Sequence, residues 1–314
     1  MKEFSFIRSK NILITGASGF IGYYLSELCI KNGANLYGID INLPKNISIW
    51  KEFIQKELGK DALESIMINN NIDYVFHLSG SASVGLSFKN PYDDFTSLVP
   101  STISLLVCIS KYSPEAKLIT FSSAAVYGNP ISLPINEEDT KNPISPYGIH
   151  KSINESLLES YSKLFKIDCS VLRIFSAYGV GLRKQLFWDV MNKYKINNEY
   201  IELFGTGLET RDFISVNDVV RAGLQISNIS CKNYFNVYNV ANGVETTIND
   251  AVNLLFSSLN SKPKIIFKGQ NMIGNPLNWR ANIDKLSATG FRSMYSISKE
   301  LDYYFKWFIN LDAK

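Results

Sequence analysis

The chain has 314 residues, of which 46% are apolar and 19% charged, so it is long enough to bury one large core or two modest ones. This composition excludes disorder, collagen and coiled coil. Its 32 Lys and Arg side chains nearly balance 29 Asp and Glu side chains, and a net charge of +3 does not favour nucleic acid or a lipid surface as a partner. We therefore expect no nucleic-acid or membrane partner, and any anionic ligand must be met by local charges.

Few residues are suited to holding a metal ion. The chain has four cysteines, none in a C-x-x-C pair, and two histidines, so we expect no metal site. The cysteines stand in apolar surroundings, as buried thiols of a reducing compartment do, which predicts a cytoplasmic protein. Glycines break the apolar run near the start, and we find no stretch of the roughly 18 apolar residues that a membrane span needs. The cysteines are Cys29, Cys108, Cys169 and Cys231, and the histidines are His77 and His150.

The first half of the chain alternates apolar strands with helical stretches, which is typical of a parallel sheet covered by helices on both faces. Apolar residues from Ile21 to Cys29 fall at helical spacing before Gly33, a natural stop. A second helix is expected from Ser145 as N-cap and Pro146 at the first helical position. An apolar stripe on this helix comprises Ile149, Ile153, Leu157 and Leu158. Strands are expected at residues 11–15, 35–39, 73–78, 117–122 and 169–175.

Three glycines lie directly between the first expected strand and the first expected helix, in the stretch NILITGASGFIG. A tight turn needs a residue without Cβ, and a pyrophosphate approaches the backbone only where side chains are absent. The helix N-terminus that follows offers free N–H groups and a partial positive charge. Gly16, Gly19 and Gly22 therefore predict a dinucleotide site, unless they only permit a close contact between helix and strand.

An acidic residue ends the next expected strand. Asp40 follows Gly16 by 24 residues, close to the spacing of about 20 expected for an acid that binds the adenosine ribose. Its carboxylate would accept hydrogen bonds from a 2′-hydroxyl and repel a 2′-phosphate, which favours NAD over NADP. An ordinary loop acid is the alternative, because Asp is common where strands end.

The second half of the chain loses the regular alternation. Beyond about residue 176 short segments rich in Asn, Gly and aromatic residues take over, and we expect a smaller lobe that binds the substrate. Residues 235–242 are expected to form a strand and residues 246–259 a capped helix, so part of this half returns to the main sheet. We therefore expect an α/β chain with a Rossmann-type doubly wound parallel sheet, in which residues 1–175 and 212–242 form the NAD-binding domain. Residues 176–211 and 243–314 would form the interleaved substrate lobe.

Two further stretches contain candidate catalytic residues. FSSAAVYG follows the fourth expected strand, at the edge where open α/β sheets bind ligands. Tyr147 and Lys151 are four residues apart on a helix and therefore share a face. A tyrosine has an ordinary pKa near 10, and we expect the Lys151 ammonium and an oxidised nicotinamide to lower it. Tyr147 would then take a proton from a sugar hydroxyl while Ser123 holds the reacting oxygen. The alternative is an exposed Tyr beside a solvated Lys.

Together these motifs resemble the extended short-chain dehydrogenase/reductases, in particular the NAD-dependent epimerase/dehydratase group that acts on nucleotide sugars. The likeness spans nearly the whole chain, through TGASGFIG, HLSGSAS, SPYGIHK, LRIFSAYG, GTGLETRDFISVNDVV and GNPLNWRANIDKL. It implies Tyr147 as base, Lys151 as its helper and Ser123 as the Ser/Thr of the catalytic set. It also implies a cofactor site formed by Gly16, Ser18, Gly19, Phe20, Ile21, Gly22, Asp40, Leu78, Gly80, Ser81, Tyr147 and Lys151. The implied substrate site comprises Ser123, Ala124, Ser176 and Arg211, the last against a diphosphate, and we add Arg183 and Arg280 to it because of their charge.

Departures from the family pattern reduce the number of reactions that this chain is expected to catalyse. The acids that follow the Ser/Thr in 4,6-dehydratases are Ala124 and Ala125 here, and methyl groups cannot do acid and base work. The family's Asn positions hold Ser176 and Leu98, and the Asp of its GDP motif is Asn275. Arg183, Lys184, Lys268 and Arg280 are candidates to replace missing charge at the diphosphate. Phe187, Trp188 and Phe204 are candidates for a stacking wall.

The favoured hypothesis is an NAD-dependent nucleotide-sugar 4-epimerase, which removes hydride at sugar C4 and returns it to the other face of a 4-keto intermediate. The alternative is an NAD(P)H-dependent reductase of a nucleotide-linked 4-keto-6-deoxy sugar. A third hypothesis is a non-catalytic sensor that binds a dinucleotide and a partner protein, although such proteins typically lose the Tyr and Lys. The resemblance also implies a homodimer formed through two helices of each subunit.

Overall fold

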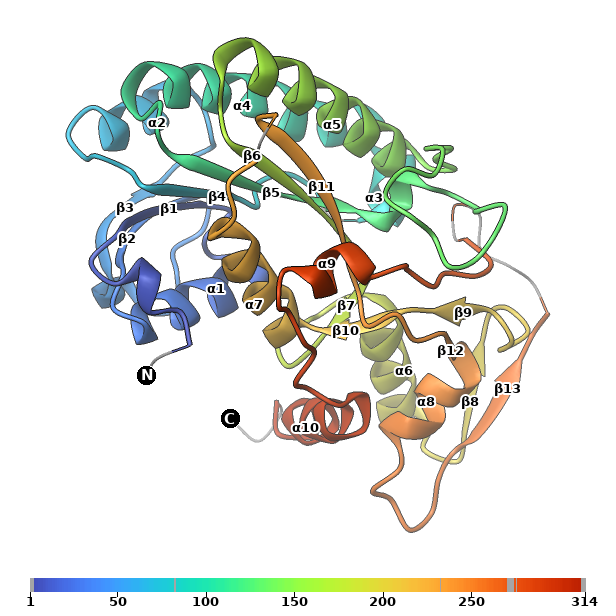
Figure 1. Cartoon of the computed structure of the whole chain (residues 1–314). Coiled ribbons are helices and arrows are strands. Elements are labelled where there is room, and N and C mark those ends of the chain that lie inside the picture. Colours follow the sequence, from blue (N-terminus) through green and yellow to red (C-terminus); the bar gives the residue numbers. More distant parts are fainter. Residues whose placement is uncertain (1–2, 82, 232, 270–273, 275, 312–314) are drawn as a thin grey trace.

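The computed structural model describes residues 3–81, 83–231, 233–269, 274 and 276–311. In this part of the chain seven strands form one parallel sheet in the order β11-β6-β5-β4-β1-β2-β3 (Figure 1). The direction of winding reverses between β1 and β4, which is where open α/β sheets bind ligands. The expected Rossmann-type fold is confirmed. The strands are β1 (Asn11–Thr15), β2 (Asn35–Asp40), β3 (Trp50–Gln55), β4 (Tyr74–His77), β5 (Lys117–Ser123), β6 (Cys169–Ile174) and β11 (Phe235–Val240).

Of the two edge strands of the sheet, β11 is predicted from the sequence and β3 is not. β11 is the strand expected within residues 235–242, and it pairs with β6 from Phe235 to Val240 as a late return to the main sheet. β3 is not among the expected strands, because its sequence WKEFIQ mixes charged and apolar residues without clear alternation. It pairs with β2 at the far edge of the sheet, where polar side chains reach solvent.

Helices cover both faces of the sheet and bury separate apolar clusters against it. One cluster lies under α1 and α7 and includes Leu25, Phe76 and Leu224. The other lies under α2, α4 and α5 and includes Leu106, with Leu158 on α5. These helices are α1 (Phe20–Lys31), α2 (Lys60–Met67), α4 (Pro91–Tyr112), α5 (Pro146–Phe165) and α7 (Val216–Ser227), and the short α3 (Val84–Lys89) precedes α4.

Helix α5 begins as the sequence predicts, but it turns a different face to the core. The Ser145 hydroxyl accepts a hydrogen bond from the Gly148 N–H at 3.2 Å, and Pro146 is the first helical residue. The expected apolar stripe lies largely outside the core, since Ile149 and Ile153 are exposed. The residues buried along α5 are Gly148, Lys151, Asn154, Glu155, Leu158 and Ser162, of which only Leu158 is a large apolar residue.

Helix α4 corrects the expectation about membrane spans. Among the described residues it is the one helix long and apolar enough to cross a membrane by length and composition alone. It packs against the sheet through Leu105, Leu106 and Ile109, which are fully buried, so it also meets the description of a core helix. Length and composition alone are therefore the same for a membrane span and for a core helix of this kind.

A smaller lobe with its own aromatic core packs against the carboxyl-end side of the sheet (Figure 1). Its core includes Tyr178, Phe187, Phe213 and Tyr304, and the helix over Ile297–Ile309, which contains Tyr304, packs into it. The helix expected at residues 246–259 is shorter, and the Thr247 hydroxyl caps it. The paired strands are β7 (Ser176–Tyr178) with β10 (Phe213–Ser215), β9 (Thr210–Arg211) with β12 (Thr246–Thr247), and β8 (Tyr200–Leu203) with β13 (Lys264–Phe267). The helices are α6 (Gln185–Ile196), α8 (Ile248–Leu255), α9 (Asp284–Ala288) and α10 (Ile297–Ile309).

Candidate active site

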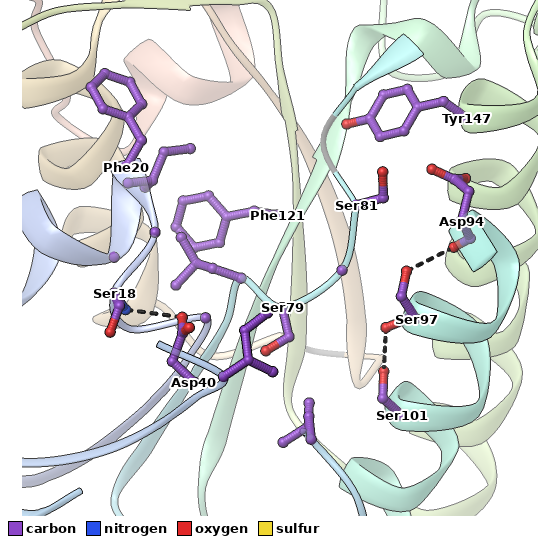
Figure 2. A pocket seen from close by; sticks show the side chains of 18 of the residues that line it. Ser18, Phe20, Asp40, Ser79, Ser81, Asp94, Ser97, Ser101, Phe121 and Tyr147 are labelled. Carbon is purple, nitrogen blue, oxygen red and sulfur yellow. Dashed lines mark hydrogen bonds between the residues drawn. The ribbon is translucent and has the colours of Figure 1, made fainter. Parts of the chain in front are cut away.

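A cavity of about 1130 Å³ runs along the carboxyl ends of the central strands and is closed on one side by α4 and α5. Figure 2 shows Ser18 and Asp40 together on one side of it and Tyr147 on the opposite side. The structure gathers into this lining every residue expected to bind the dinucleotide, together with the expected catalytic set. These residues are Gly16, Ser18, Gly19, Phe20, Ile21, Gly22, Asp40, Leu78, Gly80, Ser81, Ser123, Tyr147 and Lys151.

The glycine loop forms a cradle that side chains would fill. Gly16 has a left-handed backbone with φ +70°, and a Cβ there would lie 2.7 Å from the Leu78 carbonyl carbon. A Cβ on Gly22 would strike the carbonyl oxygen of Gly16. Helix α1 therefore starts directly against the loop and aims its free N–H groups at the cavity. These features fit the pyrophosphate of a dinucleotide.

Asp40 is fixed at the adenosine end of the cavity by backbone donors. Its two carboxylate oxygens accept hydrogen bonds from the Ser18 N–H at 3.0 Å and the Asn42 N–H at 2.8 Å. Lys56 and Glu57, at the end of β3, line the same end of the cavity, and sequence reasoning missed them because it missed β3. A charged acceptor held this way suits a ribose diol and disfavours a 2′-phosphate.

We expect the substitution Asp40→Asn to weaken NAD binding by about 10-fold, because a hydrogen bond to a charged group contributes about 1.5 to 3 kcal/mol and the amide keeps part of it. Binding of NADP should improve in the same variant, since the repelling charge is gone. Calorimetric titration of nucleotide-stripped protein with each dinucleotide checks both. Asp61→Asn, which removes an exposed carboxylate of α2, is the matched control. Unchanged NAD affinity in Asp40→Asn would contradict the assignment.

Ser123, Tyr147 and Lys151 meet where β5 ends and α5 begins. The Ser123 side chain lies close enough to Tyr147 to lower the pKa of its phenol, and the Lys151 ammonium donates to the Phe121 carbonyl at 3.0 Å. The Lys151 nitrogen lies 5.8 Å from the centre of the Tyr147 ring. Gly148 permits this arrangement, because a Cβ there would lie 2.5 Å from the Ala125 carbonyl oxygen, and α5 would have to move away from the serine.

Burial governs the proton affinities of this group. It raises the pKa of Tyr147 to about 12, and the neighbouring Ser123 side chain offsets only part of the rise. It lowers the pKa of Lys151 to about 8. Desolvation of the phenolate is the largest cause of the rise in the Tyr147 pKa, and the negative charge of Asp94 adds to it. The expected lowering by Lys151 together with an oxidised nicotinamide stays a prediction.

The residues expected to bind the substrate are more scattered, and none except Ser123 lines the cavity. Ala124 is fully buried, and the Ser176 N–H pairs with the Asp212 carbonyl. The Arg183 guanidinium instead lies over Trp188 and Trp307, at 6.0 and 5.9 Å from the ring centres, while its neighbours Lys184 and Gln185 line the cavity. The backbone of Arg280 pairs with Ile135, and Asn275 lies outside the described residues.

Arg211 is a half-buried cation of the second lobe. Burial lowers its pKa to about 10, and its guanidinium donates to the Thr210 carbonyl at 2.7 Å and the Leu277 carbonyl at 3.1 Å. It also lies 5.6 Å from the Trp279 ring centre. Of the other candidates, Phe187 is buried in the lobe core, whereas Phe204 is exposed and has the Lys193 ammonium 5.9 Å from its ring centre.

Each of the two histidines contacts polar side chains of other elements. His77 is buried between Thr15 and Thr102, at 2.8 and 3.1 Å from their hydroxyls, and burial lowers its pKa to about 3. It is therefore a packed histidine. His150 forms a 2.6 Å contact with Asp94, a cavity-lining residue that sequence reasoning missed.

The sequence of residues 12–241 matches the NAD dependent epimerase/dehydratase family. The chain belongs to this family. A UDP-glucuronate 4-epimerase from Thermodesulfobacterium geofontis is 28% identical over 269 residues, which cover 80% of this chain and 81% of the relative. The UDP-glucuronic acid 4-epimerase from Bacillus cereus, solved with UDP-glucuronic acid and NAD, is 27% identical with a TM-score of 0.85, and the match covers 96% of this chain and 99% of that one.

A third similar protein is named for a different sugar. The UDP-N-acetylglucosamine 4-epimerase from Methanobrevibacter ruminantium, solved with UDP-N-acetylmuramic acid, is 26% identical with a TM-score of 0.85. This match covers 96% of this chain and 99% of that one. As a member of the epimerase/dehydratase family, this chain is an NAD-dependent enzyme of the nucleotide-sugar epimerase type, and its glycine cradle and Asp40 fit NAD.

Proposed function

We propose that the protein is an NAD-dependent UDP-sugar 4-epimerase. The observation that carries the proposal is the grouping of Ser123, Tyr147 and Lys151 in the lining of the cavity that the glycine loop borders. The similar 4-epimerases of three organisms support both the reaction and a uridine nucleotide. The buried side chains of Ala124 and Ala125, directly after Ser123, leave no acid at the positions that a dehydratase uses.

The residues of the chain handle the proton of the sugar hydroxyl. When bound, NAD supplies the acceptor and donor of the hydride at C4. Tyr147 takes the proton of the C4 hydroxyl as the C4–H bond breaks, and the bond between C4 and its oxygen becomes a carbonyl. Ser123 donates a hydrogen bond to that oxygen, and the Lys151 ammonium stabilises the phenolate. In the return step Tyr147 gives the proton back, after the sugar has turned its other face, so protons and electrons balance over the cycle.

The second lobe would bind the nucleotide part of the substrate. Arg211 is a half-buried guanidinium that donates hydrogen bonds to carbonyls, and such a group can also pair with an anion such as a diphosphate. Phe204, half exposed at the end of β8, is the proposed stacking partner of the base. We accordingly propose the division into an NAD-binding domain of residues 1–175 and 212–242 and a substrate lobe of the remaining segments.

The first test is the cofactor state of the purified protein, followed by incubation with a panel of UDP-, GDP- and dTDP-sugars without added cofactor. The proposal expects about one NAD per chain and interconversion of C4 isomers of a UDP-sugar with no net redox change. An empty site, with turnover only of 4-keto sugars and only with added NADH or NADPH, would overturn it in favour of a reductase. Dinucleotide binding without turnover of any sugar would instead favour a sensor.

We further propose a cytoplasmic enzyme that forms a homodimer through α4 and α5. These two helices lie side by side on the outer side of the sheet (Figure 1), and they expose Tyr92, Ile149, Ile153 and Leu164. Exposed apolar side chains concentrated on adjacent helices suit a second copy of the chain. The four buried free cysteines suit a reducing compartment.

The substitution Ile153→Glu is expected to convert a dimer to a monomer, because it places a charge within this apolar surface. Sedimentation equilibrium of the wild type and the variant measures the change. Ser156→Glu, one turn further along α5 and also exposed, controls for added charge at a polar position. A wild-type protein that sediments as a monomer would rule out the dimer.

A further inference from the structure

Asp94 and His150 form a nearly buried pair between α4 and α5, directly beside the catalytic residues. The His150 Nδ1 atom lies 2.6 Å from an Asp94 carboxylate oxygen, and the two side chains are 13% and 3% exposed. The Phe95 ring packs edge-on against the imidazole, with 5.5 Å between ring centres. The pair therefore holds the carboxylate of Asp94 in one place.

The second carboxylate oxygen of Asp94 has a different environment. It is buried and has no hydrogen-bond partner among the described residues, although Asp94 lines the cavity. Figure 2 shows the Asp94 side chain on the side of the cavity where Ser81 and Tyr147 also lie. A buried carboxylate oxygen left without a donor is costly, so its negative charge is felt strongly by neighbouring groups.

Lys151 needs a negative charge near it. Its ammonium is buried, it donates a hydrogen bond to an uncharged carbonyl, and Lys184, which also lines the cavity, repels it. Two carboxylates stabilise it, Asp94 and Glu155. Glu155, however, is already bound by the Arg173 guanidinium at 2.8 Å and by the Ser122 hydroxyl at 2.6 Å. Of these two carboxylates, Glu155 therefore pairs with an arginine, whereas Asp94 pairs with His150.

We propose that Asp94, held by His150, is a positioning residue of the catalytic site whose negative charge keeps the Lys151 ammonium charged. This inference rests on the proposed 4-epimerase, in which that ammonium supports the Tyr147 phenolate. The charged and titratable groups facing Lys151 are Asp94 from α4, Tyr147 and Glu155 from α5, His77 from β4 and Lys184 before α6.

The charge of Asp94 acts on both catalytic groups in the same direction. It raises the pKa of Lys151 and also the pKa of Tyr147, since a negative charge favours the protonated form of each. Its removal must lower both values. The ammonium is then lost at a lower pH, and the phenolate also forms at a lower pH. Both limbs of the pH profile should move toward acid, by about one unit each.

The test compares Asp94→Asn with the wild-type holoenzyme on the UDP-sugar that the panel identifies. The pH profile of kcat/KM is expected to shift to lower pH on both limbs, with KM changed less than kcat. Asp94→Glu, which restores the charge, should return the profile toward its wild-type position even if its maximum stays lower. Glu159→Gln is the matched control, because it removes an exposed carboxylate of α5 that pairs with Lys163 on the same helix. Equal profiles for wild type and Asp94→Asn, or a uniform loss at every pH, would overturn the proposal.

A second readout does not depend on turnover. The ionisation of Tyr147 can be followed by ultraviolet difference titration, as the signal lost in Tyr147→Phe, both in the wild-type background and in the Asp94→Asn background. The midpoint should fall in Asp94→Asn whether or not the protein turns over a sugar. A wild-type protein without epimerase activity would therefore refute the proposed function alone, and an unmoved Tyr147 midpoint would refute this inference alone.

Discussion

Replacing Tyr147 with phenylalanine is expected to lower kcat for 4-epimerisation by about 10² to 10⁴-fold, the range that a positioned acid–base group contributes. In the proposed mechanism this hydroxyl exchanges a proton with the substrate, and Ser123 lines the same cavity. No other phenol is expected to replace it, because Tyr127 is bound to Asn239 and Arg173 and lies outside the cavity lining. The change removes one oxygen without opening a large space, so the fold should be kept.

The measurement is initial rates with the identified UDP-sugar, together with bound NAD and the melting temperature of each protein. Tyr161→Phe is the matched control, since it removes a phenol from the same helix at a position outside the cavity lining. NAD content and Tm near wild type in Tyr147→Phe would assign the loss to chemistry. Turnover within a factor of about three of wild type, with NAD in place, would remove Tyr147 from the mechanism.

The cofactor side of the site could be predicted from the sequence because its determinants are local. A strand, a glycine loop and a helix start lie within residues 11–22, and the backbone there has little choice once Gly16 turns with φ +70°. Ser145 and Pro146 locate the start of α5 in the same way. Each of these features depends on residues a few positions apart, where chain geometry alone fixes the contact.

The opposite side of the site depends on contacts between distant segments. Asp94 and His150 are 56 positions apart, and nothing in either local sequence says that α4 and α5 bring them within hydrogen-bond distance. The exposure of Ile149 and Ile153 could not be predicted either. A helical stripe shows which residues share a face but not what covers that face. Whether Arg183 or its neighbour faces the cavity is likewise set by Trp188 and Trp307, which hold the guanidinium outside it.

Gly22 is the position where the smallest side-chain addition should do the most damage to cofactor binding. A Cβ there would strike the Gly16 carbonyl oxygen and lie 2.7 Å from the carbonyl oxygen and 2.9 Å from the carbonyl carbon of Ala17. All three are backbone atoms, so no side chain can turn aside to make room. Helix α1 must move away from the glycine loop, and its N–H groups then no longer point at the site of the pyrophosphate.

Gly22→Ala is therefore expected to purify with less than about a tenth of the NAD of the wild type and to lose about 1 to 3 kcal/mol of unfolding free energy. Nucleotide release on denaturation and urea titration measure the two quantities. Gly85→Ala is the matched control, because Gly85 lies in α3 and a Cβ there meets nothing within 4 Å. That variant should keep its NAD and gain about 0.5 to 1 kcal/mol, since alanine is the better helix former. Normal NAD content in Gly22→Ala would mean that the loop tolerates displacement of α1, and the cradle would then not depend on the close contact between Gly16 and Gly22.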